Sequence, residues 1–144
     1  MDIFYKISNK TLKLTNVSYD KLAENLRKTY NDDCYCYNIQ DVIDIMRKHK
    51  NKFIYLDLSN NMISDNGLPK LVNELLDYKF IEKINFSKNR ISDLGLQILK
   101  PLLYLPNLKK LHIHKNYGPS DETLLYYTID GAQINNSILE KLYY

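Results

Sequence analysis

The chain of 144 residues has no tryptophan, only two cysteines and no long apolar run. Its longest apolar run is a few residues, whereas a membrane-spanning helix needs about 20, and the opening MDIFYKISN lacks the apolar stretch of a secretory signal. Cys34 and Cys36 are too close along an extended chain to bridge each other, which suits a reducing compartment. These absences predict an intracellular, cytoplasmic protein without a membrane span.

An excess of one charge is also lacking, because 20 basic and 17 acidic residues leave a net charge of only +3. This balance disfavours a nucleic-acid binder, whose domains are usually strongly basic. The motifs H-E-x-x-H, G-x-G-x-x-G, G-K-[ST] and G-x-S-x-G are all missing. Nothing in the sequence therefore indicates an enzyme or a bound cofactor, and the length suits one domain spanning residues 1–144.

What the sequence does contain is a repeat. LDLSNNMISDNG (56–67) returns as INFSKNRISDLG (84–95), and Leu56, Ile84 and Leu111 are spaced by 28 and 27 residues. Four segments share the apolar pattern that precedes the turn: FIYLDL (53–58), IEKINF (81–86), LKKLHI (108–113) and LEKLYY (139–144). Two weaker copies, LKLTN (12–16) and CYCYN (34–38), precede them at spacings of 22. We therefore expect six repeat units, because a period of this length is typical of stacked architectures.

Each unit is expected to be a strand, a turn and a helix. Alternation places Leu56 and Leu58 on one strand face and Asp57 on the other. Helical spacing of apolar residues follows each strand, in segments 18–30, 40–50, 67–76 and 95–103, with Pro101 kinking or ending the last one early. A strand, a helix and another strand in one sheet make that sheet parallel. The recurring asparagine is expected to be buried and to bond the backbone of the turns in neighbouring units.

The pattern L-x-x-L-x-L-x-x-N, with ISD and a glycine after the asparagine, resembles the leucine-rich repeat family in its ribonuclease-inhibitor-like class. The resemblance is clear for residues 53–116, weaker for 10–52, and extends to a C-terminal strand or cap at 117–144. It implies an α/β solenoid arc with about six short parallel strands on the concave face and helices on the convex face. Each unit would bury its apolar side against the next.

The outward residues of the strands form the candidate site. Three tyrosines gather in the first half of the expected strand face, and lysine and histidine dominate the second half. Aromatic residues supply rigid contact area and cations select an acidic partner, so this face is predicted to bind a protein. The alternative is an ordinary solvated sheet surface. The predicted binding residues are Tyr35, Tyr37, Tyr55, Asp57, Lys83, Asn85, Lys110, His112 and His114.

The same residues allow other interpretations. His112 and His114 could bridge a zinc ion, but a third ligand is missing from the neighbouring strand. Ser87 and Asp57 could join His112 in a triad, but an open sheet offers no oxyanion donors. The alternative function is binding of nucleic acid or another anionic surface, through Lys83, Lys110, Lys141 and the basic run 47–52.

The ends of the repeat series carry two further expectations. Cys34 and Cys36 occupy core positions of their unit and are expected to be structural, with no metal or redox role. The final strand at 139–144 leaves an edge, where the chain could either fray or associate with itself or a partner.

Overall fold

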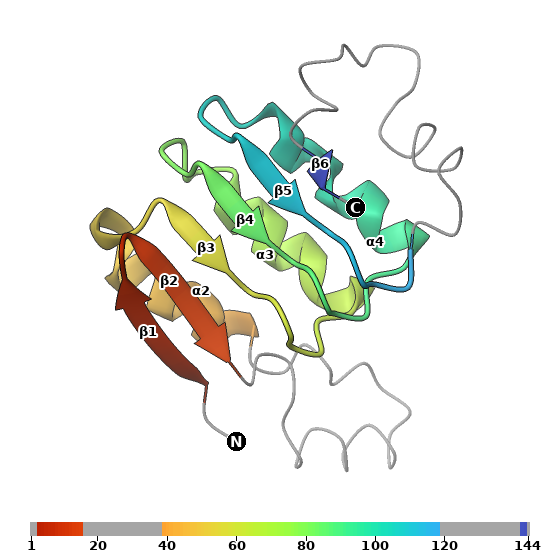
Figure 1. The fold of residues 1–144 in the computed structure, drawn as a ribbon, viewed down its shortest axis with the longest axis horizontal. Coiled ribbons are helices and arrows are strands. Elements are labelled where there is room, and N and C mark those ends of the chain that lie inside the picture. Colours follow the sequence, from red (N-terminus) through yellow and green to blue (C-terminus); the bar gives the residue numbers. More distant parts are fainter. Residues whose placement is uncertain (1–2, 16–38, 119–141, 144) are drawn as a thin grey trace.

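The computed structural model of the chain describes residues 3–15, 39–118 and 142–143. One sheet of six strands runs through them in sequence order. Its strands are β1 (Phe4–Ser8), β2 (Thr11–Thr15), β3 (Tyr55–Asp57), β4 (Lys83–Asn85), β5 (Lys110–His112) and β6 (Leu142–Tyr143). All neighbours from β2 to β6 are parallel, as Figure 1 shows. The predicted α/β class with a mostly parallel sheet is confirmed.

Helices cover one face of this sheet (Figure 1). The α-helices are α2 (Ile39–Lys48), α3 (Leu68–Leu75) and α4 (Asp93–Leu99), and the 3-10 helices are η2 (Lys50–Lys52), η3 (Asp65–Gly67) and η4 (Lys100–Tyr104). Pro101 lies in η4, and α4 ends two residues before it, as predicted. The helix expected at 18–30 lies outside the described residues. Within the described part of the chain, no helix has the length and apolar character needed to cross a membrane.

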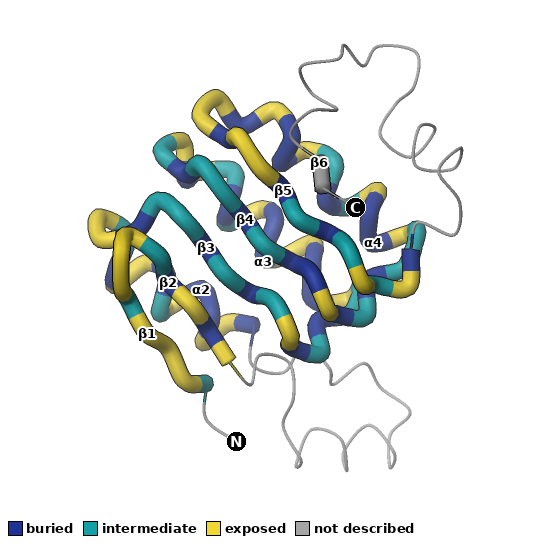
Figure 2. The backbone as a smooth tube through the Cα atoms, viewed as in Figure 1, coloured by how far each residue is buried: buried dark blue, intermediate teal, exposed yellow. Residues whose placement is uncertain are grey.

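The core lies between the sheet and these helices. Alternation along the strands buries every second residue. β2 contributes Leu12 and Leu14 to the core, and the segment that begins with β3 contributes Leu56 and Leu58. The helices add their apolar faces, with Leu71 of α3 fully buried. Figure 2 shows this as buried stretches alternating with more exposed ones along the strands. One continuous core therefore forms across the units, because no single short strand and helix could bury its apolar side alone.

The strand register reproduces the alignment of the sequence repeat. Leu56 pairs with Ile84, and Ile84 pairs with Leu111, so residues at equivalent repeat positions are neighbours across the sheet. At the far end, Leu111 pairs with Leu142. The predicted strand near the C-terminal end of the sequence is therefore confirmed, in the predicted register.

The N-terminal part of the sheet differs from the prediction in two respects. β2 pairs directly with β3, through Thr11 and Tyr55, so a strand at 34–38 does not lie between them. The segment with Tyr35, Tyr37 and the two cysteines lies outside the described residues. A regular spacing of 22 residues suggested the extra strand, but a short apolar alternation does not establish which strands pair.

The second difference from the predicted sheet is the direction of β1, which pairs with β2 in the antiparallel direction. The two-residue turn of this hairpin, Asn9 and Lys10, has φ of 50° and 60°, as the tight type I′ turn requires. The sheet thus contains five parallel strands and one antiparallel edge strand, instead of six parallel strands.

The recurring asparagines form a hydrogen-bonded ladder under the turns. Asn89 donates through Nδ2 to the carbonyls of Phe86 (2.9 Å) and Leu58 (3.0 Å) and accepts from the amide of Ile63 at 3.1 Å. Asn61 also donates to the Leu58 carbonyl, at 3.0 Å. A carbonyl in one unit thus receives donors from two asparagines, and this links consecutive units. The prediction that these amides are buried and satisfied is confirmed.

The backbone before each asparagine repeats as well. Asn60, Lys88 and Lys115 all have φ of 57° or 58°, in the left-handed region that few residues other than glycine enter readily. Each precedes its ladder asparagine by one position. The turn therefore directs successive asparagine side chains inward in the same way.

Candidate functional site

The face of the sheet opposite the helices carries the candidate site, and we call it the open face. Along β2 to β5 and just after β3, β4 and β5, it carries the residues that alternate with the core: Thr11, Lys13, Tyr55, Asp57, Ser59, Lys83, Asn85, Ser87, Lys110, His112 and His114. Cα pairing arranges them in rows across the strands, with Tyr55 beside Lys83 and Lys83 beside Lys110. Equivalent residues on adjacent strands are about 4.8 Å apart, so each row is closely spaced.

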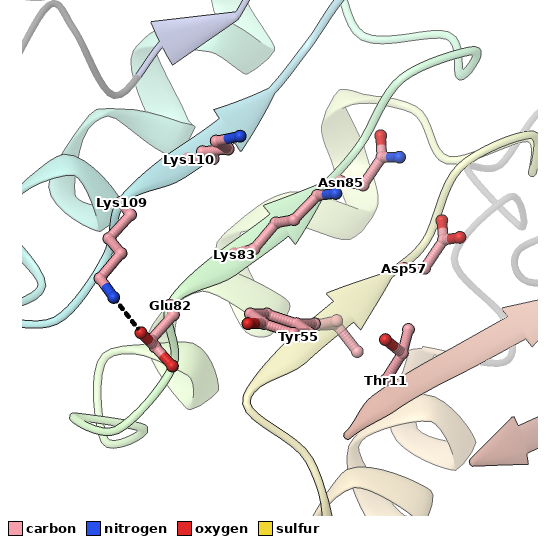
Figure 3. A pocket seen from close by; sticks show the side chains of 9 residues that line it. Thr11, Tyr55, Asp57, Glu82, Lys83, Asn85, Lys109 and Lys110 are labelled. Carbon is pink, nitrogen blue, oxygen red and sulfur yellow. Dashed lines mark hydrogen bonds and ion pairs between the residues drawn. The ribbon is translucent and has the colours of Figure 1, made fainter. Parts of the chain in front are cut away.

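A pocket of about 380 Å³ opens on this face, across β2 to β5. Its lining is Thr11, Tyr55, Leu56, Asp57, Glu82, Lys83, Asn85, Lys109 and Lys110. In Figure 3 the Tyr55 ring lies beside Lys83, and the Lys83 side chain extends along β4 toward Asn85. An aromatic ring, an aliphatic stem and polar groups therefore meet in one depression, which is the usual make-up of a ligand pocket.

Local hydrogen bonds fix the polar end of the pocket. Asp57 Oδ1 accepts from the amide and the hydroxyl of Ser59, at 2.9 and 2.6 Å. Asn85 Oδ1 does the same with Ser87, at identical distances. Asp and Asn side chains commonly stabilise turns in this manner, so the Asp57 carboxylate and the Asn85 amide are held in fixed orientations. The two positions are interchangeable structurally and differ by one negative charge.

Charge on the open face is mainly positive. Lys109 forms an ion pair with Glu82 at the rim of the pocket, drawn as the dashed line in Figure 3, and this raises the pKa of Lys109. Lys83 has no ion pair among the residues that the structure describes, although Lys110 lies beside it. Adjacent like charges across strands are unfavourable. Two lysines therefore occupy neighbouring positions on β4 and β5 in the lining of the pocket.

The repeat that contains β5 has His112 and His114 at the positions of the Asp57–Ser59 and Asn85–Ser87 pairs. The rings of His112 and His114 meet edge to face, with centroids 5.8 Å apart. Burial lowers the pKa of His112 below its usual value, and the positive charges of Lys83, His114 and Lys110 lower it further, against the opposing effect of Asp57. Burial and the neighbouring positive charges therefore both favour the neutral form of His112.

Six of the nine predicted binding residues stand together on β3, β4 and β5. Five of these line the pocket, and His112 lies beside Asn85 on the neighbouring strand. His114 lies two residues beyond His112 on the same face. Tyr35 and Tyr37 lie outside the described residues. Sequence reasoning missed Glu82 and Lys109, which precede their strands, yet they occupy equivalent repeat positions 27 residues apart. An acid and a base at equivalent positions of adjacent repeats were the signal that could have found them.

The other interpretations find little geometric support. Ser87 is buried and donates its hydroxyl to Asn85, and Asn85 stands between Asp57 and His112 in their row, so the three triad candidates are not connected. Within the described ranges, no three His, Cys, Asp or Glu side chains are grouped to hold a metal ion. The 47–52 run lies at the end of α2 and in η2, away from the open face, where Arg47 pairs with Glu74 at 2.7 Å.

Comparison of the chain with known protein families, with curated proteins and with solved structures finds no match.

Proposed function

We propose that the chain is a short solenoid of the leucine-rich repeat kind, and that it binds a protein partner on its open face without catalysing a reaction. The open face is the concave strand face of that proposal. The repeated asparagine ladder and the repeat-matched strand register support the solenoid. Both are what consecutive, equivalent units require of one another.

The observation that carries the binding proposal is the pocket with Tyr55 and Lys83 at its centre. Tyrosine and cationic side chains are enriched where proteins bind one another, because rigid rings give contact area with little loss of entropy. Tyr55 is only partly buried and lies on a rigid strand. It is therefore suited to act as an anchor for a partner.

The test is affinity capture from a lysate of the native cell, with the full chain as bait. Tyr55→Ala should lose proteins that the wild type retains. Tyr104→Ala is the matched control, because Tyr104 is 54% exposed and lies in η4 on the helical side. Retained proteins are quantified by mass spectrometry. If Tyr55→Ala retains every protein that the wild type and Tyr104→Ala retain, the open face is not the binding surface.

A further inference from the structure

β1 forms one edge of the sheet, and among the described residues it pairs with a strand on one side only. It stands first in the strand order and pairs with β2. Figure 1 shows it at the outer end of the sheet, and Figure 2 shows most of it exposed. Its five residues make it longer than β3, β4 and β5, which have three each. The sheet therefore presents a long edge at its hairpin end.

The register of the hairpin shows which backbone groups of β1 point outward. The Lys10 carbonyl accepts from the amide of Ile54 at 3.0 Å, so even-numbered residues along β2 bond toward β3 and odd-numbered ones toward β1. The odd-numbered residues of β2 pair with the even-numbered residues of β1. The outward N–H and C=O groups of β1 therefore belong to Tyr5 and Ile7, and to Ile3 just before the strand.

β1 has few of the features that prevent pairing at a sheet edge, which are usually proline, bulges and several charges. It contains no proline, its register with β2 is unbroken, and Lys6 is its only charged residue. It exposes Phe4 by 62% and Tyr5 by 45%. The Tyr5 ring packs on His49, with centroids 5.0 Å apart, so its position is fixed. Large exposed side chains on a regular edge favour the addition of another strand.

We propose that β1 pairs with β1 of a second copy of this chain in the antiparallel direction, so that two sheets join into one across a twofold axis. Such a dimer is closed, because each copy contributes the same edge and leaves no further copy of it to pair. The proposal goes beyond the binding function proposed for the open face and is independent of it.

The side chains of β1 distinguish the registers that place outward backbone groups opposite one another. With Lys6 on the axis, two ammonium groups would lie directly opposite, which is unfavourable. With Ile7 on the axis, the pairing would run into the turn at Asn9, whose φ of 50° lies outside the strand region. With Tyr5 on the axis, neither problem arises, so this is the expected register.

The Tyr5 register sets apolar residues against apolar residues and a cation against a ring. On the helical side, Ile3 of one copy lies opposite Ile7 of the other, and both side chains pack against the core of their own copy. On the open face, Phe4 lies opposite Lys6 of the second copy, at a pair without main-chain bonds, where side chains are closest. An aromatic ring attracts an ammonium group at such a distance. About six main-chain hydrogen bonds complete the pairing.

Sedimentation velocity of the full chain, over about a hundredfold range of concentration, measures the dissociation constant of the dimer. Phe4→Ala should raise it about tenfold or more, because the twofold axis removes two ring contacts at once. Tyr104→Ala is the matched control, since Tyr104 is 54% exposed on the helical side, and it should change the constant less than about twofold. Tyr5→Pro should abolish the dimer, because it removes an outward donor and leaves the N–H groups that bond β2.

Cross-linking tests the register separately. The Phe4→Cys and Lys6→Cys variants are mixed and oxidised with diamide, and the linked peptides are identified by mass spectrometry. The mixture should give a disulfide between positions 4 and 6 of different chains, because opposed side chains of such a pair are close enough to bridge. Either variant alone should link little, since neither position lies opposite itself. Phe4→Cys mixed with Lys70→Cys, at an exposed position of α3, measures random collision.

Several results would overturn the proposal. They are a wild type that stays monomeric, a Phe4→Ala dimer as stable as that of the wild type, or a mixture that gives no more of the 4–6 link than the Lys70→Cys control. Loss of the dimer in Tyr143→Pro would assign the association to β6, at the opposite edge. Steep weakening with salt would also contradict it, because the paired residues include no carboxylate. A monomer that retains a lysate protein only when Phe4 is present would assign the edge to another protein. Circular dichroism establishes that each variant is folded, and the 4–6 link decides the matter if Tyr5→Pro unfolds.

Discussion

Replacing Asn89 by alanine tests whether the asparagine ladder holds the repeat units together. The side chain is 6% exposed, and its loss leaves the Ile63 amide without the acceptor that it has at 3.1 Å. The carbonyls that Asn89 serves are less affected, because the Leu58 carbonyl keeps Asn61 and the Phe86 carbonyl keeps Asn116 as a donor. One buried amide without a partner costs about 1–3 kcal/mol, and the weakened carbonyl bonds bring the expected loss to about 2–4 kcal/mol.

Urea unfolding followed by circular dichroism measures this loss. With a denaturant dependence of about 1–3 kcal/mol per molar for a small domain, the midpoint should fall by about 1–2 M. Asn89→Asp should be at least as damaging, because it keeps an acceptor for Ile63 but turns an oxygen toward the Phe86 carbonyl, where Nδ2 donates at 2.9 Å. Asn73→Ala, the same change at an exposed position of α3, should stay within about 0.5 kcal/mol of the wild type. A loss at Asn89 no larger than at Asn73 would refute the role given to the ladder.

Three further predictions concern other parts of the sheet and its helices. Gly95→Ala should destabilise the fold by about 1–3 kcal/mol in the same assay, because a Cβ there would clash with Asp65 Oδ1; an unchanged midpoint would contradict this. Burial and nearby lysines lower the pKa of His49 below 6.5, so the folded state binds fewer protons, and stability should rise with pH from the lowered value to about 6.5. His49→Gln should flatten that rise, and an unchanged slope would count against the assignment. Edge pairing of β6 with another chain predicts a sedimentation coefficient that increases with concentration in the wild type but not in Tyr143→Pro; a wild type that stays monomeric would exclude it.

The sequence predicted most reliably what repeats. The spacing of Leu56, Ile84 and Leu111 predicted which strands are neighbours and in which register, because equivalent units bury equivalent residues against each other. The same logic placed Tyr55, Lys83 and Lys110 side by side, and therefore most of the pocket.

Sequence reasoning failed where the pattern was short or unique. The alternation at 34–38 matched a strand as well as that at 12–16 did, but only long-range pairing decides which strand lies next to β3. The β1–β2 hairpin has no second copy in the chain, and its turn, Asn9–Lys10, lacks the glycine that usually marks such turns. Contacts between residues outside the strands, such as Lys109 with Glu82, required the three-dimensional arrangement before they became evident.

The antiparallel hairpin of β1 and β2 forms one end of the sheet, and the sheet can lengthen away from it. The ladder bonds of Asn89 stay within its own unit or reach an immediate neighbour. A tandem duplication of residues 81–107 in the gene would therefore present each copy with the surroundings that one copy already has. The hairpin would remain a fixed beginning, while the number of units between it and β6 could change without redesign of the core. Each added unit would also widen the open face by one strand, so the width of the proposed binding surface would scale with the number of repeats in the gene.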